Sequence, residues 1–263
     1  MTTQSVGNPR LIVEDLAKTF GGVVALSGVG LQARSRQVLS IIGPNGAGKT
    51  TLINGISGVY PPNRGRVLLD GQDITRLPAY RVAQAGIART FQNVALFRGM
   101  TVLENIMLGR NTRMHAGVLS CGLFWGPAQR EEIRHRRHVE EIIDFLEITH
   151  IRTTPVGALP LGLQKRVELG RALAAEPRVL LLDEPMGGMN IEEKESMARY
   201  VLDVVEGMDT AVVLIEHDMG VVMDISDYII VLDQGMQIAQ GTPEEVRTDP
   251  VVIEAYLGKP HAA

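Results

Sequence analysis

The stretch Gly43-Pro44-Asn45-Gly46-Ala47-Gly48-Lys49-Thr50 fits the pattern G-x-x-x-x-G-K-[ST] at every fixed position. The largely apolar residues 38–42 before it predict a buried strand, and residues 52–56 after it predict a helix. This strand–loop–helix setting is the context in which the motif binds the phosphates of a nucleotide. The rest of the chain is therefore interpreted around a triphosphate site.

Each part of this motif has a chemical role at a triphosphate. Glycines let backbone N–H groups approach phosphate oxygens that a side chain would block, and the following helix N-terminus adds partial positive charge. Lys49 can reach the β- and γ-phosphates, Thr50 can bind Mg²⁺, and Thr51 can hydrogen bond to the α-phosphate. The predicted phosphate-binding residues are Gly43, Pro44, Asn45, Gly46, Ala47, Gly48, Lys49, Thr50 and Thr51.

The composition excludes several classes of protein. The 263 residues include 26 Lys and Arg against 30 Asp and Glu, and the net charge of −4 argues against charge-driven binding of nucleic acid. A single cysteine, Cys121, leaves no disulfide framework and no cysteine metal cluster. The polar residues 1–10 do not resemble a secretory signal. The uncharged apolar stretch 116–129 is shorter than the roughly 20 residues of a membrane-spanning helix, so we expect no bilayer crossing.

Hydrophobic periodicity predicts an α/β fold in a single domain over residues 1–263. Residues 11–42 alternate apolar and polar positions around Gly21-Gly22 and Gly30, which is typical of short antiparallel strands. Apolar runs separated by helical patterns predict a mostly parallel sheet with helices on both faces. These runs lie at residues 179–182, 211–215, 228–232 and 236–239.

Residues 93–175 have a helical pattern that interrupts the α/β pattern of residues 1–92 and 176–263. Thr101 and Glu104 form a capping box, and residues 129–148 carry apolar positions at helical spacing beside a charged face. We therefore expect a helical subdomain inserted into an α/β core. Within it, the apolar patch at residues 119–125 is either a packed helix corner or a surface that faces a partner.

Polar residues follow the predicted parallel strands, and open α/β sheets bind ligands beyond the carboxyl ends of their strands. Asp183 is placed to hold Mg²⁺ together with Thr50, directly or through water. Glu184 can act as the general base on the water that attacks the γ-phosphorus. His217 can hydrogen bond to the γ-phosphate, and Gln92 can span the metal and the water, although each residue alone carries little information.

Together these motifs resemble those of the ATP-binding cassette (ABC) ATPases, and the resemblance covers nearly the whole chain. The matching segments are Gly43–Thr50 (Walker A), Phe91-Gln92 (Q-loop), residues 159–164 (family signature), residues 179–184 (Walker B), residues 187–190 (D-loop) and His217 (switch histidine). One branch is more similar still, the ATP-binding subunits of branched-chain amino-acid importers. The segments similar to that branch are residues 20–22, 89–93, 216–219, 241–246 and 253–258.

The resemblance implies a P-loop NTPase cassette with a RecA-like, mostly parallel core, an N-terminal antiparallel β subdomain and an inserted α-helical subdomain. It implies a head-to-tail dimer, formed with a second copy or with a sister subunit. Pro160, Gly162 and Asn190 would contribute to nucleotide binding across that dimer, and Phe20 would stack on adenine. Spacing alone fits a core role for Phe20 nearly as well.

One departure from the family pattern bears on chemistry. Pro160 replaces the serine of the signature, and Leu161 takes a position that is usually glycine or aromatic. The hydroxyl contact to the partner's γ-phosphate is therefore missing. Gly162 and the helix N-terminus behind it can still supply backbone donors, so we expect a weaker contact that persists.

The resemblance implies the ATPase subunit of a bacterial importer of branched-chain or similar small amino acids. It would use ATP and Mg²⁺ and lie on the cytoplasmic face of the inner membrane, where transmembrane permease subunits hold it. A separate substrate-binding protein would deliver the transported substrate to those permease subunits. Importers of urea, short amides or aromatic acids share this pattern. A soluble cassette acting on ribosomes or DNA is disfavoured, because such proteins usually carry two cassettes or a long coiled coil. A nonhydrolytic module is disfavoured because Lys49, Asp183, Glu184 and His217 are all present.

Overall fold

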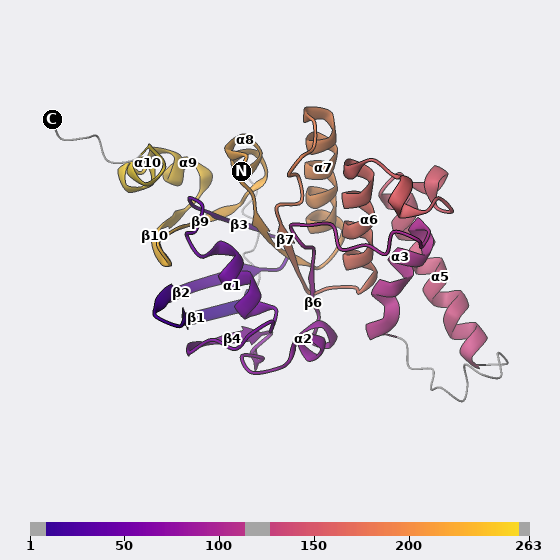
Figure 1. Cartoon of the computed structure of the whole chain (residues 1–263), viewed down its shortest axis with the longest axis horizontal. Coiled ribbons are helices and arrows are strands. Elements are labelled where there is room, and N and C mark those ends of the chain that lie inside the picture. The colour runs from indigo at the N-terminus through magenta and orange to yellow at the C-terminus, as the bar shows by residue number, and fades with distance from the viewer. Residues whose placement is uncertain (1–8, 114–126, 258–263) are drawn as a thin grey trace.

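The computed structural model describes residues 9–113 and 127–257 of the chain (Figure 1). Cys121 and the apolar patch at residues 119–125 lie outside the described residues. Among the helices of the described ranges, none is both long enough and apolar enough to cross a membrane.

A six-stranded sheet runs through the molecule in the order β10-β9-β3-β8-β7-β6 (Figure 1). All neighbours pair in parallel except β10 with β9, so the predicted mostly parallel sheet is confirmed. The strands are β3 (Val38–Ile42), β6 (Ile87–Arg89), β7 (Val179–Asp183), β8 (Ala211–Ile215), β9 (Tyr228–Asp233) and β10 (Met236–Gly241).

A second, antiparallel sheet has the order β2-β1-β4-β5. Its strands are β1 (Pro9–Phe20), β2 (Val23–Arg34), β4 (Arg64–Leu69) and β5 (Gln72–Asp73). The antiparallel pairing of the first strands is confirmed, but the expectation of short strands was wrong. Strands β1 and β2 each span 12 residues, and Gly30 lies inside β2 instead of ending a strand. Register shifts, including one beside Asp15 with its positive φ, let the pairing continue past such irregular positions.

The parallel strands are buried on both faces, which explains their continuous apolar sequences. Because successive side chains of a strand point to opposite faces, each strand supplies two cores. In β7, Val179 and Leu181 enter the core that the antiparallel sheet covers. Leu180 and Leu182 enter the core on the other face, which extends into the helices.

Helices flank the sheet and also form a separate group. The flanking helices are α1 (Lys49–Ile56), α2 (Ala79–Ala85), α7 (Ile191–Gly207), α8 (Met219–Ile225), α9 (Pro243–Thr248) and α10 (Pro250–Leu257). The group of α3 (Val102–Leu108), α5 (Pro127–Phe145) and α6 (Leu161–Ala174) packs together, at the end of the view opposite the antiparallel sheet (Figure 1). Short 3₁₀ turns lie at Gly109–Thr112, Thr149–Ile151 and Val156–Ala158.

Local helix signals behave as the sequence predicts. The predicted capping box of Thr101 with Glu104 is confirmed, and two further capping boxes lie at Asn190 with Glu193 and at Thr242 with Glu245. Each box satisfies backbone N–H groups that the helix leaves without partners, so the helix starts are set locally. The buried side of α7 carries apolar and aromatic residues at helical spacing: Met197, Tyr200, Val201, Val204 and Val205.

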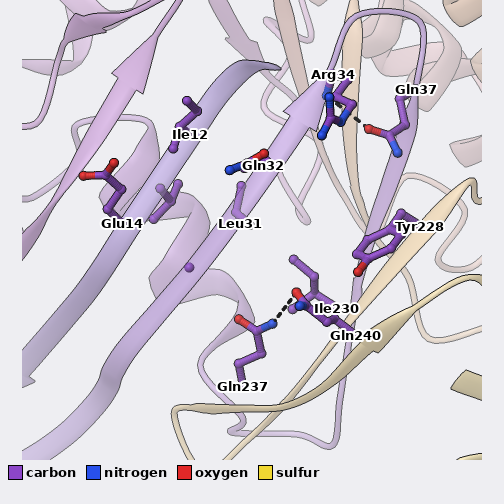
Figure 2. A pocket seen from close by; sticks show the side chains of 12 residues that line it. Ile12, Glu14, Leu31, Gln32, Arg34, Gln37, Tyr228, Ile230, Gln237 and Gln240 are labelled. Carbon is purple, nitrogen blue, oxygen red and sulfur yellow. Dashed lines mark hydrogen bonds between the residues drawn. The ribbon is translucent and has the colours of Figure 1, made fainter. Parts of the chain in front are cut away.

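A polar groove of about 560 Å³ lies between strands β1 and β2 on one side and β9 and β10 on the other (Figure 2). Its amides bond within the groove: Gln237 donates to Gln240 at 2.7 Å, and Gln37 accepts from the Arg34 N–H at 3.2 Å. Gln37 precedes β3 and Tyr228 begins β9, so the groove lies toward the amino ends of these parallel strands. The predicted site lies at their opposite, carboxyl ends.

Candidate nucleotide and catalytic site

The parallel sheet brings four functional segments to one edge. Strands β3, β8, β7 and β6 are adjacent, and all four run in the same direction. The phosphate loop follows β3, Asp183 ends β7, His217 follows β8, and Gln92 follows β6. Residues that are up to 174 positions apart in the sequence (Gly43 and His217) therefore follow neighbouring strand ends.

The phosphate loop requires glycine for steric reasons. Gly43, Gly46 and Gly48 have φ values of 148°, 82° and 100°. A Cβ on Gly43 would clash with the Leu232 carbonyl oxygen, and one on Gly48 would lie 2.7 Å from the carbonyl oxygen of Ala25. Helix α1 begins directly at Lys49, so its free N–H groups face the same loop.

Lys49 is buried against the loop it follows. Its Nζ donates hydrogen bonds to the carbonyl oxygens of Gly43 at 2.7 Å and Pro44 at 2.9 Å. Desolvation lowers the pKa of Lys49, and the negative charges of Glu184 and Asp183 partly oppose this shift. Both acids therefore act electrostatically on the Lys49 ammonium group.

Asp183 is almost completely buried, at 1% exposure. Its Oδ2 accepts a hydrogen bond from Arg89 Nη2 at 2.9 Å, whereas its buried Oδ1 has no hydrogen-bond partner within the described residues. An unpartnered buried carboxylate oxygen is costly, and hard divalent cations take such oxygens as ligands. The residues present therefore fit a Mg²⁺ site that includes Asp183.

The Glu184 carboxylate contacts two of the other predicted site residues. Its Oε2 accepts from Gln92 Nε2 at 2.9 Å, and its Oε1 lies 2.7 Å from His217 Nε2. Glu184 has a φ of 50°, which is unusual for a residue other than glycine. Its N–H donates to the Ile215 carbonyl at 2.9 Å, and its carbonyl accepts from Lys165 Nζ at 2.7 Å. The strained backbone is therefore held from both sides.

Sequence reasoning missed a set of buried charged residues around this site. They are Arg89, Lys165, Glu168 and Glu216. Glu168 accepts from the N–H groups of Phe91 at 3.3 Å and Ala95 at 3.4 Å, so it holds the Q-loop and the segment that follows it. Glu216 accepts from the N–H of Met186 at 2.7 Å, just after Glu184. A signal existed for Arg89 and Glu216, because each is charged and lies at the end of an apolar strand.

Burial is the largest cause of the pKa shifts of three of these residues, Lys165, Glu168 and Glu216. Desolvation raises the pKa of Glu168 and of Glu216, and the backbone N–H groups that bond to each carboxylate partly oppose the shift. Desolvation lowers the pKa of Lys165, and the charges of Glu216, Glu168 and Glu184 oppose it. These groups thus form one electrostatic cluster beneath Glu184.

Phe20 ends β1, and the residue is 46% exposed. The ring packs edge to face on Tyr60 with centroids 5.1 Å apart, and the Tyr60 hydroxyl donates to the Thr51 carbonyl at 3.1 Å. Lys18 Nζ lies 5.1 Å from the Phe20 centroid. An exposed aromatic ring therefore stands beside the phosphate-loop helix, and its stacking on adenine stays a prediction.

The remaining predicted residues belong to two helix ends that touch each other. Pro160 is the N-cap of α6 and Asn190 is the N-cap of α7. A Cβ on Gly162 would clash with the Glu193 carboxylate, which completes the capping box of Asn190. Pro160 makes no side-chain capping bond, which fits the loss of the signature hydroxyl. Nucleotide contacts by Pro160, Gly162 and Asn190 stay predictions.

The fold and the site define the class of protein, a P-loop ATPase with an inserted helical region. The family model described as ABC transporter matches residues 26–187, and the model described as branched-chain amino acid ATP-binding cassette transporter matches residues 237–262. The chain belongs to the ABC transporter family, as an ATPase subunit that couples ATP hydrolysis to transport.

Three similar proteins illustrate this membership. The high-affinity branched-chain amino acid transport ATP-binding protein BraF of Pseudomonas aeruginosa is 41% identical, over 97% of this chain and 100% of its own length. An ABC transporter cassette solved in its ADP conformation is 34% identical, with a TM-score of 0.83 over 95% of this chain and 99% of that one. A bacterial ABC transporter cassette solved as a dimer is 25% identical, with a TM-score of 0.75 over 89% and 98%. The predicted cassette fold is confirmed.

Proposed function

We propose that this ATPase subunit drives the uptake of branched-chain or similar small amino acids through a separate permease. The observation that carries the substrate class is the match of residues 237–262 to the branched-chain cassette model, outside the ATP-binding motifs. The similarity to BraF along the whole chain supports the same class. The catalytic half of the proposal depends on the arrangement around Glu184.

In this proposal Glu184 takes a proton from the attacking water, and the side chains bonded to Glu184 set the orientation of its carboxylate. Gln92 and His217 each bond to a different oxygen of the Glu184 carboxylate. They come from separate segments, so movement of either segment changes the orientation of the base. This links the hydrolytic step to the positions of the Q-loop and of the loop after β8.

The phosphates bind to the N–H groups of the glycine loop and to Lys49, which exchanges its carbonyl partners for phosphate oxygens. Thr50, Gln92 and Asp183 would hold Mg²⁺, which supplies charge neutralisation at the transferred phosphoryl group. The support within this chain is the unpartnered Oδ1 of Asp183. Phe20 would stack on adenine, where its ring is partly exposed.

The assembly we propose is a dimer with a second copy or a sister subunit, at the cytoplasmic face of the membrane. Pro160, Gly162 and Asn190 would act on the nucleotide of the opposite subunit, and the cassette solved as a dimer supports such pairing. Residues 93–175 form the helical subdomain of one domain that spans residues 1–263.

We also propose that the permease subunits contact the surface where the Q-loop meets the helical subdomain. Phe91 and Phe97 expose large apolar side chains there, at 45% and 59%. A substrate-binding protein would act through the permease and would not contact this chain. Exposed aromatic side chains are frequent anchors of protein interfaces, which favours this surface over the charged faces nearby.

The function is tested by uptake in cells that lack this subunit. Cells complemented with the wild type should take up radiolabelled leucine, isoleucine or valine, and cells complemented with Glu184→Gln should not. Equal expression of the two proteins is the control. Restored uptake of urea, a short amide or an aromatic acid in place of these amino acids would overturn the substrate class and leave the ATPase assignment intact.

A further inference from the structure

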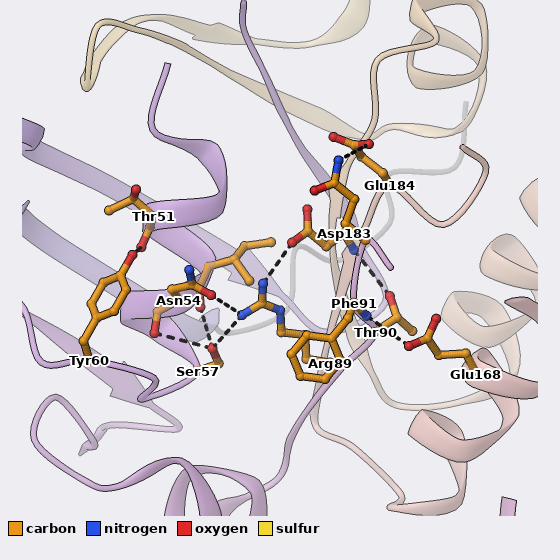
Figure 3. A network of polar contacts seen from close by, with 12 residues as sticks. Thr51, Asn54, Ser57, Tyr60, Arg89, Thr90, Phe91, Glu168, Asp183 and Glu184 are labelled. Atoms are coloured by element: carbon orange, nitrogen blue, oxygen red, sulfur yellow. Dashed lines mark hydrogen bonds and ion pairs between the residues drawn. The ribbon is translucent and has the colours of Figure 1, made fainter. Parts of the chain in front are cut away.

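Arg89 connects two parts of the site that come from distant segments (Figure 3). It ends β6, and its side chain is only 9% exposed. One guanidinium nitrogen, Nη2, donates to Asp183 Oδ2 at 2.9 Å. The other, Nη1, donates to Asn54 Oδ1 and, at 3.2 Å, to Ser57 Oγ. Arg89 therefore links strand β7 to helix α1.

At Asp183, the contact with Arg89 gives the two carboxylate oxygens different environments. Oδ2 is bonded to the guanidinium, whereas Oδ1 is buried without a hydrogen-bond partner within the described residues. Arginine commonly binds both oxygens of a carboxylate, and here it takes one. The remaining oxygen is left for another ligand.

At α1, the contact acts on the helix face that carries Thr50. Asn54 lies four residues after Thr50, and residues at this spacing share one face of a helix. Arg89 holds Asn54 and Ser57, so it sets where the Thr50 face of α1 lies relative to Asp183. Thr50 on α1 and Asp183 on β7 are the proposed metal ligands that these two segments supply.

A role in stability alone does not account for this arrangement. Buried ion pairs often contribute little net stability, because desolvation offsets the attraction between the charges. The fork shape of arginine is needed to reach partners on both α1 and β7 at once, which a lysine ammonium on its flexible stem does not reproduce. The geometry therefore favours a role in positioning.

We propose that Arg89 is a positioning residue for the divalent cation of this site. It orients Asp183 so that Oδ1 is available to the cation, and it fixes the distance from Asp183 to the helix that carries Thr50. The proposal rests on the Mg²⁺ site proposed above. It adds a residue that acts through the metal ligands and does not touch the nucleotide.

The test measures metal binding directly, with Mn²⁺ as the probe and a non-hydrolysable ATP analogue present. Bound Mn²⁺ is quantified by electron paramagnetic resonance for the wild type, Arg89→Met and Arg89→Lys. Arg89→Met should lower the Mn²⁺ affinity about 10–100-fold, the range seen when partners of metal ligands are removed. The Mn²⁺ affinity of Arg89→Lys should lie between those of the wild type and Arg89→Met. Affinity for the analogue in EDTA should change little, since Arg89 does not contact the phosphate loop.

Controls separate this proposal from the metal site itself. Arg66→Met removes an arginine from the antiparallel sheet, where its side chain is 63% exposed, and should leave Mn²⁺ binding unchanged. Asp183→Asn with wild-type Mn²⁺ affinity would overturn the metal site. Loss of affinity in Asp183→Asn together with wild-type affinity in Arg89→Met would overturn the role of Arg89 alone.

A second variant covers the case in which Arg89→Met does not fold. The double substitution Asn54→Ala, Ser57→Ala removes the α1 half of the link and leaves the Arg89–Asp183 pair in place. It should also lower Mn²⁺ affinity, by less than Arg89→Met. Unchanged affinity in a folded double variant would refute the claim that Arg89 sets the position of α1.

Discussion

Lys165 offers a sharp test of how the catalytic base is held. Its Nζ donates to the main-chain carbonyl of Glu184 at 2.7 Å, and the lysine itself comes from α6, the helix behind the signature segment. Lys165→Met removes the donor and keeps most of the apolar volume of the side chain. The variant therefore perturbs the backbone of Glu184 and leaves the carboxylate in place.

The expected size of the effect follows from the strain at Glu184. A residue other than glycine at a φ of 50° costs about 1–3 kcal/mol, which the surrounding contacts must offset. A hydrogen bond from a charged donor contributes about 1.5–3 kcal/mol, a similar amount. If the turn relaxes and that stabilisation is lost in the transition state, kcat should fall about 10–100-fold, because 1.36 kcal/mol corresponds to a factor of ten.

The assay is steady-state ATP hydrolysis, with nucleotide affinity measured separately. Lys165 bonds to Glu184 and not to the phosphate loop, so KM for ATP and nucleotide affinity should change far less than kcat. Lys165→Arg restores a charged donor and should recover much of the rate. A kcat within twofold of wild type in Lys165→Met, or equal losses in both variants, would refute the reasoning.

Three further predictions follow from other parts of the site. Glu184→Gln should retain ATP and lose turnover by about 10²–10⁴-fold, the contribution of a general base, whereas Lys49→Ala should weaken binding itself; full hydrolysis by Glu184→Gln would exclude the base role. Adding Pro160→Ser to Glu184→Gln should strengthen ATP-driven dimerisation, measured by light scattering or sedimentation. Unchanged dimerisation would contradict the interpretation that Pro160 removes a hydroxyl contact to the γ-phosphate bound by the opposite subunit. Burial raises the pKa of Glu168 above its ordinary value of 4.5, so the folded state keeps this proton at a pH where the unfolded chain has lost it. The free energy of unfolding therefore falls as pH rises from the unfolded-state pKa to the higher folded-state pKa. In thermal unfolding, the stability of Glu168→Gln relative to the wild type should therefore increase as pH rises from about 4.5. A stability difference between the two proteins that does not change with pH would contradict the raised pKa of Glu168.

Much of the fold was predictable because its signals are local. The apolar run at residues 179–182 identified a strand buried on both faces, and the capping box at Thr101 marked the start of α3. Gly30 was misjudged because a glycine inside a long strand and a glycine between two short strands look alike in sequence. Only the pairing of β2 with β1 distinguishes them.

The network around the site was harder to predict, because it depends on burial. Lys165 and Glu168 lie on a helix among polar neighbours, and such residues usually face solvent. Both are buried here, because α6 packs against the edge of the sheet where Glu184 and the Q-loop lie. No local pattern in residues 161–174 records which segment will cover that face.

By itself, the sequence determined the phosphate loop, the acids at the end of β7 and the alternation of strands and helices, since each depends on neighbours within a few positions. Only the tertiary structure decided that Arg89 joins Asn54 to Asp183 and that Lys165 supports Glu184. These contacts cross 19 to 94 positions in the chain. They form because parallel strands end at one edge of the sheet, where buried charged groups must find partners among whatever the fold brings there.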